Sequence, residues 1–395
     1  MNCSGIDVST GEFVTVEFEE TITRVQPGGE LHSGSEVRPR GETPAGDAVY
    51  LAPGFIDIQV NGFAGVDFNN VGTPLGEISK ALEMILSTGV TRCLPTIITG
   101  GPEEMLSCLT VLRKAQRELP NAAAIAGFHV EGPYIGAEDG PRGAHPLKWV
   151  RPPSLEEYRR WQDATEGNVR LVTLSPHWPE APAWIAEVVK ENVTVSIGHT
   201  GASAEQIEAA VHAGATLSTH LGNGAHRVMQ RHPNYLWDQL AEDRLSASFI
   251  VDGIHLGRSF LRTALRAKTV ARAVLVTDAS APAGAAPGRY QLGEQFADLT
   301  PDGRVVLTGT DKLAGSALKM HDGVSNLVHL GGLSLRDAVQ MATVNPARII
   351  HLKNRMHGLQ PGERGDLVRF RFPDRGGAGQ RLEIESVYLE GRRVA

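Results

Sequence analysis

The stretches VSIGHTGAS (195–203) and THLGNGAH (219–226) share one local pattern. In each, an apolar or β-branched run typical of a buried strand ends in a histidine, and small residues then lead toward a helix. His199 and His220 are therefore predicted at strand ends, where a helix-covered parallel sheet opens onto a cavity. Two imidazoles from successive strands can share one metal ion; the alternative is that each histidine only closes a loop.

Around these stretches, strand-like runs alternate with helical patterns from residue 53 to 354. The predicted strands are GFIDIQV (54–60), VTRCLPT (90–96), IAGFHV (125–130), VRLVTLS (169–175), VTVSIGH (193–199), ATLSTHL (215–221), LSASFIV (245–251) and RAVLVTD (272–278). The predicted helices cover 75–89, 102–119, 154–164, 181–192, 203–214 and 259–267, with a further helix over 334–350. Eight such alternations with nearly continuous apolar strands indicate a (β/α)8 barrel rather than an open sheet.

Both ends of the chain have a different character. FVTVEFEE (13–20) and TITRV (21–25) alternate as short strands do, and VQPGGELHSG (25–34) and RPRGETPAGD (38–47) break them with Gly and Pro. RGDLVRF (364–370) and IESVYLEGRRVA (384–395) resemble the N-terminal pieces. The simplest arrangement is one small β module with parts at 1–52 and 355–395, flanking a barrel at 53–354. Two separate terminal hairpins are the alternative.

Composition restricts the class of protein. The 395 residues are 41% hydrophobic and 21% charged, within the range of globular proteins. A net charge of −7 and a pI near 6.1 argue against a general nucleic-acid binder and favour a small-molecule partner. Cys3, Cys93 and Cys108 have no paired spacing, which suggests a reducing, cytoplasmic setting. We expect neither a signal peptide nor a membrane span.

If the middle of the chain is a barrel, the residues after its strands face one mouth. They are Gln59, Asn61, Glu131, His199, His220, His255 and Asp278. Glu131 with the two histidines supplies three ligands, as in catalytic zinc sites that leave a position open for water. Bound water has a pKa lowered from about 15.7 to about 7, which gives a hydroxide nucleophile.

Asp278 is the candidate proton shuttle, first as general base and then as general acid to a leaving nitrogen. Its alternatives are a fourth metal ligand or a helix N-cap. His145 and His255 lie in loops where a neutral imidazole can bind a hydroxyl group or polarise a carbonyl group. No role is assigned to His212, His232 or His321.

Nine motifs in this order carry a resemblance. They are PGFIDIQVNG, FHVEGPYI, TLSP, SIGHT, STHLGN, DGIH, VTDASAPAG, LAGSALKM and NPARII. They resemble those of the N-acetylglucosamine-6-phosphate deacetylases in the amidohydrolase superfamily. The resemblance implies a distorted (β/α)8 barrel with a small β-sandwich from both termini, a homodimer, and hydrolysis of an N-acetyl amide to an amine and acetate.

The resemblance also assigns roles to single residues. It makes Glu131, His199 and His220 the metal ligands and Asp278 the proton donor and acceptor. The sugar-binding elements it implies are Ala144, His145, the turn from Asp252 to His255, and the backbone of Leu313, Ala314 and Gly315. Family members with two metals carry His-x-His where this chain has Gln59-Val60-Asn61, so we expect one divalent ion per subunit. Zinc is favoured over iron, manganese and cobalt, which the ligands also suit.

One loop departs from the family pattern. The family reads Thr-His-Leu, an aromatic residue, Asn-Ala-Met and then Arg-Glu-Pro, whereas this chain reads THLGNGAHRVMQRHP (219–233). Asn223 and Arg231 hold the positions that bind the sugar phosphate, with Gly224 beside them, and His226 or Arg227 can add charge. The alternative is an ordinary solvated Arg231 and a loop shaped for another ligand.

Three functions follow. The leading one is metal-dependent deacetylation of N-acetylglucosamine-6-phosphate, with the ion and His145 polarising the acetyl carbonyl. The second keeps the chemistry but acts on an unphosphorylated or other N-acyl amino sugar, or on a cyclic amide. The third is a non-catalytic sugar-phosphate binding protein on the same barrel, since one fold hosts many functions.

Overall fold

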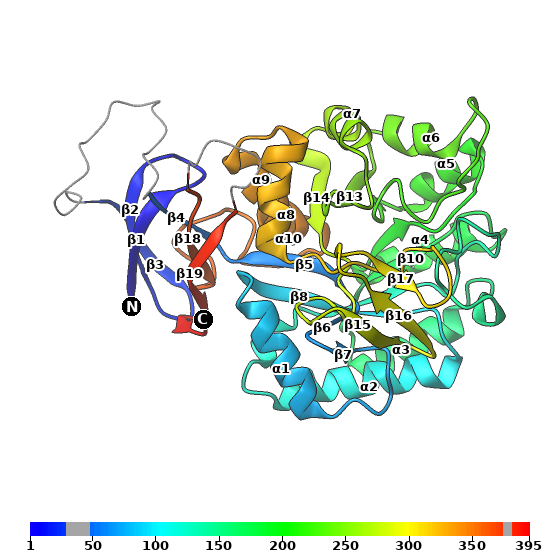
Figure 1. The fold of residues 1–395 in the computed structure, drawn as a ribbon, viewed down its shortest axis with the longest axis horizontal. Helices are drawn as coiled ribbons and strands as arrows, with labels where there is room; N and C mark the ends of the chain where they lie inside the picture. Colours follow the sequence, from blue (N-terminus) through cyan, green and yellow to red (C-terminus); the bar gives the residue numbers. More distant parts are fainter. Residues whose placement is uncertain (29–47, 374–380) are drawn as a thin grey trace.

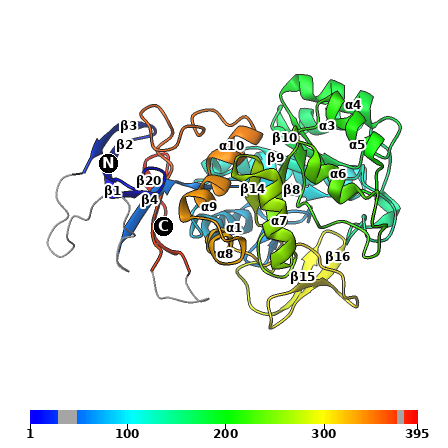
Figure 2. The ribbon, with the colours of Figure 1, turned by 90° about the horizontal axis from the view of Figure 1, so that it is seen from above.

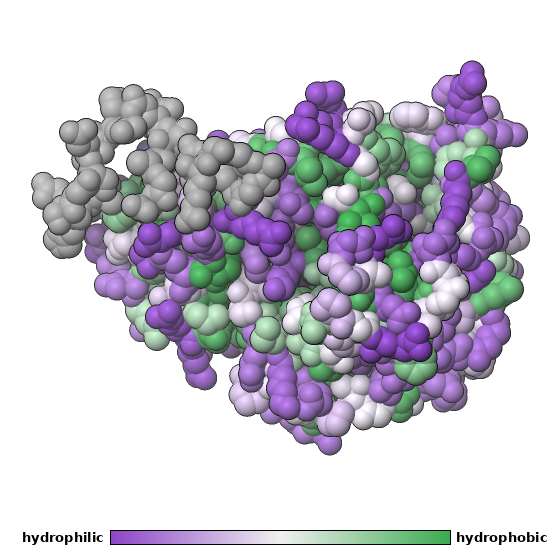
Figure 3. Space-filling view, in the orientation of Figure 1, coloured by the Kyte–Doolittle hydropathy of each residue, from purple (hydrophilic) through white to green (hydrophobic). Residues whose placement is uncertain are grey.

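The computed structural model describes residues 1–28, 48–373 and 381–395. Figure 1 shows a large barrel with helices around it and a smaller β module to one side, where both termini lie. Polar residues cover most of the face in Figure 3, and hydrophobic residues form smaller patches between them. No helix in the described ranges is long and apolar enough to cross a membrane.

The barrel contains all eight predicted strands. They are β5 (Phe55–Val60), β8 (Val90–Ile98), β9 (Phe128–Glu131), β10 (Val169–Leu174), β11 (Thr194–Ile197), β12 (Leu217–Ser218), β13 (Ser246–Ile250) and β14 (Ala273–Val276). Neighbouring strands pair in parallel in this order. A parallel bridge between Val60 and Ala279 connects the last strand to the first. All residues of β5 are buried, which explains its continuous apolar run.

The predicted helices alternate with these strands along the chain and lie on the outside of the barrel (Figures 1 and 2). They are α1 (Leu75–Leu86), α2 (Pro102–Glu118), α3 (Leu155–Thr165), α4 (Ala181–Val188), α5 (Ala204–Ala213) and α7 (Arg258–Lys268). α5 starts with a capping box formed by Ser203 and Gln206 and ends at Gly214, whose φ is 116°. Both signals are readable from sequence. The helices α6 (Tyr235–Ala241) and α8 (Met320–Asn326) were not predicted.

The helix predicted over 334–350 is broken in two. Its parts are α9 (Leu335–Ala342) and α10 (Val344–Ile349), and the break falls at Thr343, with φ −131° and ψ −82°. Pro346 has no N–H to donate to the turn before it, so the chain restarts a helix there instead of continuing one. Short helical turns are η1 (Ala122–Ala124), η2 (Leu147–Trp149), η3 (Val189–Glu191), η4 (Val270–Arg272) and η5 (Leu327–Gly331).

The small β-sandwich is built from both termini, as predicted. Its strands are β1 (Asn2–Asp7), β2 (Phe13–Phe18), β3 (Ile22–Pro27), β4 (Val49–Pro53), β18 (Leu367–Arg371), β19 (Glu383–Leu389) and β20 (Arg392–Arg393). β4 joins the two ends of the chain, because it pairs in parallel with β1 and antiparallel with β18. The Gly- and Pro-rich breaks predicted within 29–47 lie outside the described residues.

An unpredicted antiparallel sheet follows β14. It consists of β15 (Gly288–Leu292), β16 (Gln295–Leu299) and β17 (Val305–Leu307), and we call it the flap. Figure 2 shows the flap projecting from the barrel. A two-stranded ladder of β6 (Gly62–Phe63) and β7 (Val66–Asp67) follows β5.

Candidate active site

A cavity of about 580 Å³ opens at the carboxyl ends of the barrel strands. Glu131 is the last residue of β9, and His199, His220 and Asp278 each lie two residues beyond the end of their strand. All four line the cavity. Parallel strands bring their carboxyl ends to one mouth, which explains how residues up to 147 positions apart meet here.

The backbone at three of these residues is left-handed, with φ 50° at His199, 30° at His220 and 50° at Asp278. Non-glycine residues avoid this region, and its cost has to be offset by surrounding contacts. At His220 the backbone N–H donates to Ser248 Oγ at 2.7 Å. The turn at each strand end directs the side chain toward the cavity, so the backbone strain coincides with the site.

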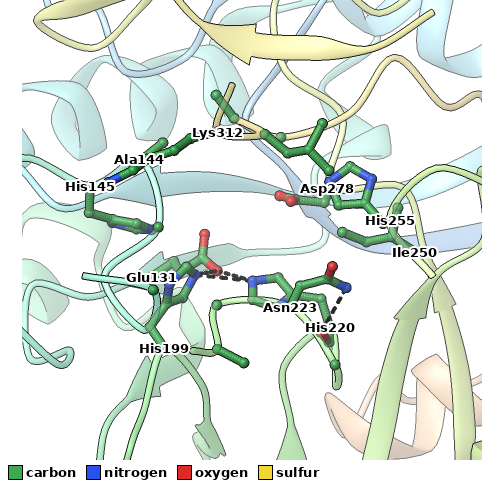
Figure 4. Close-up of a pocket in the computed structure, with 18 of the residues that line it drawn as sticks. Glu131, Ala144, His145, His199, His220, Asn223, Ile250, His255, Asp278 and Lys312 are labelled. Carbon is green, nitrogen blue, oxygen red and sulfur yellow. Dashed lines mark hydrogen bonds and ion pairs between the residues drawn. The ribbon is translucent and has the colours of Figure 1, made fainter. Parts of the chain in front are cut away.

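The side chains of Glu131, His199 and His220 converge on one point (Figure 4). Glu131 Oε1 lies 2.9 Å from His220 Nε2 and 3.2 Å from His199 Nε2, and the two Nε2 atoms are 3.1 Å apart. His199 Nδ1 lies 2.8 Å from the carbonyl oxygen of Pro141. Because that carbonyl only accepts, Nδ1 carries the hydrogen and Nε2 is left with a free lone pair in the neutral ring.

This donor set fits a divalent metal ion. Two imidazole nitrogens and a carboxylate oxygen suit zinc-like ions, and the Pro141 contact is the kind of outer contact that orients a ligating histidine. Burial raises the pKa of Glu131, but the hydrogen bonds and charges of His199 and His220 outweigh it and hold that pKa well below its usual range. Burial lowers the pKa of His220, but Glu131 outweighs it and raises that pKa.

Asp278 lies across the cavity, next to His255 (Figure 4). Its Oδ1 accepts hydrogen bonds from Asn61 Nδ2 at 2.7 Å and Gln59 Nε2 at 3.1 Å. Gln59 Nε2 also donates to Glu131 Oε1 at 2.9 Å, so one amide joins both carboxylates. Burial and the charge of Glu131 raise the pKa of Asp278 to about 6.

Three further histidines line the cavity, His145, His226 and His255, of which His145 and His255 were predicted to bind the substrate. His145 Nδ1 is 2.8 Å from the hydroxyl of Thr99, and its ring centre is 4.4 Å from that of His199. Burial and the neighbouring His199 lower the pKa of His145 to about 3, so the ring is neutral. His255 Nδ1 donates to Asp252 Oδ2 at 2.6 Å, and Asp252 Oδ1 also accepts the backbone N–H of His255.

The chain is similar to known amidohydrolases. The family model described as "Amidohydrolase family" matches residues 50–394. The N-acetylglucosamine-6-phosphate deacetylase of Danio rerio is 33% identical over 358 residues, covering 87% of this chain and 84% of that protein. This chain belongs to the N-acetylglucosamine-6-phosphate deacetylase family of amidohydrolases. It is a hydrolase of an amide C–N bond, in a superfamily that typically depends on divalent metals.

Solved structures of family members have the same fold. The deacetylase of Mycobacterium smegmatis has a TM-score of 0.86 and 30% identity, covering 100% of both chains. A variant of the Mycobacterium smegmatis enzyme in complex with N-acetyl-D-glucosamine-6-phosphate has a TM-score of 0.84 and 31% identity, covering 97% of this chain and 95% of that chain. The barrel and the β-sandwich are therefore common to this chain and these family members.

The loop that departs from the family sequence is accommodated by local changes. Gly222 replaces the aromatic residue, and a Cβ there would lie 2.7 Å from the ring of Phe260, which therefore occupies the vacated space. A Cβ on Gly224 would lie 2.8 Å from His199 Nδ1, and its φ of 55° favours glycine. Asn223 Nδ2 donates to the carbonyl oxygen of His220 at 3.1 Å, which connects the loop to one of the candidate metal ligands.

The structure places most of the other predicted residues at the cavity. Its lining includes Asn61, Ala144, His145, Asn223, Gly224, His255, Leu313, Ala314 and Gly315. Arg231 is different, because it is exposed and lies outside the lining of this cavity. Sequence reasoning missed Thr99, Asp139, Arg304 and Lys312. The last three lie in loops with no periodic pattern, and no sequence signal distinguishes them from ordinary surface charges.

Proposed function

We propose that this protein hydrolyses the N-acetyl group of N-acetylglucosamine-6-phosphate, giving glucosamine-6-phosphate and acetate. One observation carries the proposal: Glu131 Oε1, His199 Nε2 and His220 Nε2 lie within 3.2 Å of one another in a cavity that Asp278 also lines. The relatives named N-acetylglucosamine-6-phosphate deacetylase support the choice of substrate.

We propose one divalent metal ion per subunit, held by Glu131, His199 and His220, with zinc favoured over iron, manganese or cobalt. When bound, the ion supplies a Lewis acid that acidifies water and polarises a carbonyl group. Gln59 and Asn61 direct amide N–H groups, which cannot ligate a cation, at the Asp278 carboxylate. This arrangement supports a single ion.

Asp278 is proposed to take the proton of the attacking water and to deliver it to the departing amine nitrogen. Burial raises the pKa of the Asp278 carboxyl above its ordinary value, which makes the carboxylate a stronger base for this proton transfer. His145 is proposed to donate from Nε2 to the acetyl carbonyl oxygen. This requires that the Thr99 hydroxyl donates to His145 Nδ1, because a neutral imidazole carries one hydrogen.

The remaining lining residues are proposed to bind the sugar. His255, held by Asp252, is a fixed donor or acceptor for a hydroxyl group. Ala144, Asn223, Gly224 and the backbone of Leu313, Ala314 and Gly315 complete this group. We retain Arg231 as a phosphate ligand only in an assembly that brings it to a cavity, such as the proposed homodimer.

We further propose a division into a β-sandwich (1–52 and 355–395) and a barrel (53–354), and a cytoplasmic location. The three cysteines are free and buried, which fits a reducing compartment. An unphosphorylated or other N-acyl sugar, a cyclic amide and a non-catalytic role receive no support from the relatives.

The test is acetate release by the metal-replete protein from N-acetylglucosamine-6-phosphate and from N-acetylglucosamine, side by side. We expect the phosphorylated sugar to be favoured by about a hundredfold, which equals about 2.7 kcal/mol in the transition state. Acetate release from N-acetylglucosamine alone would show that the substrate is an unphosphorylated amino sugar. No acetate release from either sugar would refute the proposal.

A further inference from the structure

Three cationic side chains line the solvent side of the cavity that contains Glu131, His199 and His220. They are Arg227, Arg304 and Lys312. Arg227 and Arg304 are exposed, whereas Glu131 and the cluster histidines are buried. The cavity therefore has a buried end with metal-binding chemistry and an exposed end lined by these three cations and by Asp139 and Asp311. A hexose with a 2-acetamido group and a 6-phosphate carries these groups at opposite ends of its ring, which matches the two ends of the cavity.

The altered loop itself holds Arg227 at the cavity. Its neighbour His226 makes three contacts with two side chains. The hydroxyl of Tyr235 lies 2.9 Å from Nδ1 and accepts the backbone N–H at 2.8 Å, and Glu138 Oε2 lies 2.8 Å from Nε2. Tyr235 begins α6 and Glu138 lies in the loop after β9. These contacts fix the chain at residue 226, and Arg227 lines the cavity while Arg231 does not.

The flap holds the other two cations. Arg304 stands just before β17, where its backbone N–H donates to Thr300 Oγ1 at 3.0 Å. Lys312 follows β17, and its carbonyl accepts the Leu307 N–H at 2.8 Å. Figure 4 shows Lys312 on the opposite side of the cavity from His220. The flap thus adds two positive charges, Arg304 and Lys312, to a cavity whose candidate metal ligands come from the barrel.

Two carboxylates only partly neutralise these cations. Arg227 pairs with Asp311 at 2.9 and 3.0 Å, and Lys312 pairs with Asp139. The side chains of Asp139 and Asp311 are 72% and 75% exposed, and exposed pairs of this kind contribute little, so a dianion can compete for the cations. Among the described residues, the Arg304 guanidinium has no hydrogen bond or close ion pair, although its charge acts on Asp302 and Asp311 from a distance.

We propose that Arg227, Arg304 and Lys312 form a subsite that selects a phosphorylated sugar. This inference rests on the proposed function and names the residues that set its substrate preference. Arg304 is the principal determinant because its guanidinium is not hydrogen-bonded to a carboxylate, and it can bind two phosphate oxygens at once.

The test uses the metal-replete, full-length protein and the variants R304Q and R227Q. For each, kcat/KM is measured for N-acetylglucosamine-6-phosphate and for N-acetylglucosamine. Because a hydrogen bond to a charged partner is lost, R304Q and R227Q should each reduce the preference for the phosphorylated sugar by about tenfold or more, through KM, with the plain sugar unaffected.

Two further variants sharpen the test. R289Q is the matched control, because Arg289 is an exposed arginine on the same flap, paired with Asp298 and outside the cavity lining. D311N should increase the preference, since it removes a competitor for Arg227. The KM for the phosphorylated sugar should rise with ionic strength in the wild type and less so in R304Q.

The outcomes separate this inference from the proposed function. No acetate release from either sugar by the wild type refutes both. A wild type that deacetylates without preferring the phosphorylated sugar keeps the amide chemistry and overturns the subsite. A wild type that prefers the phosphorylated sugar, but keeps that preference in R304Q and R227Q or loses it in R289Q, also overturns the subsite.

Discussion

Replacing Asp278 by asparagine should abolish turnover without disturbing the site. The asparagine Oδ1 can still accept the hydrogen bonds from Gln59 and Asn61, so the side chain keeps its position. An amide cannot take up a proton, however, and loss of general acid–base catalysis costs about 10²- to 10⁴-fold in kcat. Acetate release measures this loss, and elemental analysis should show unchanged metal content.

The same substitution should stabilise the metal-free protein, and the effect should depend on pH. The pKa of Asp278 is about 6 in the folded protein against an ordinary value of 3.8, so folding favours the protonated carboxyl. The cost of ionising it appears as pH rises above 3.8 and is complete above about 6. A difference of about 2 in pKa corresponds to about 3 kcal/mol, a cost that asparagine does not carry.

The assay is urea unfolding of chelator-treated wild type and D278N at pH 8 and pH 4. The metal is removed because a bound cation favours the carboxylate. D278N should be more stable by up to about 3 kcal/mol at pH 8, with no advantage at pH 4. Asp163, exposed on α3, provides the control D163N, whose stability should match the wild type at both values. Equal or lower stability of D278N at pH 8, or activity within tenfold of wild type, would refute the reasoning.

Three further predictions concern the supports of the site. E131Q should weaken binding of the metal by about 100-fold or more, measured by competition with a chelating dye, because the anionic ligand is lost; unchanged affinity would place the ion elsewhere. T99V should lower kcat by about tenfold with unchanged metal content, since His145 loses the hydroxyl that sets its tautomer, and full activity would remove that role. G224A should reduce metal affinity because its Cβ would approach His199 to 2.8 Å, and wild-type affinity would show that the loop yields freely.

The barrel strands and most of the helices were predictable because their signals are local. A strand that is buried on both faces needs apolar residues at consecutive positions, which is visible in the sequence. Ser203 and Gly214 mark the two ends of α5 through hydrogen bonds and backbone angles that involve only nearby residues. Glu131 and His220 were predicted to meet because parallel strands deliver their ends to one mouth. The break at Thr343 was missed, although Pro346 was visible as its signal.

The sequence by itself determined which residues end the strands and therefore which chemistry the cavity floor can perform. The tertiary structure decided the rest, because contacts between distant loops leave no periodic trace in the sequence. Asn61 meets Asp278 across 217 residues and Lys312 meets Asp139 across 173. Arg227 faces the cavity while Arg231 lies outside it, although both belong to one loop. Which charge reaches the substrate depends on how the loop packs against α6 and the flap, and this is a property of the folded chain alone.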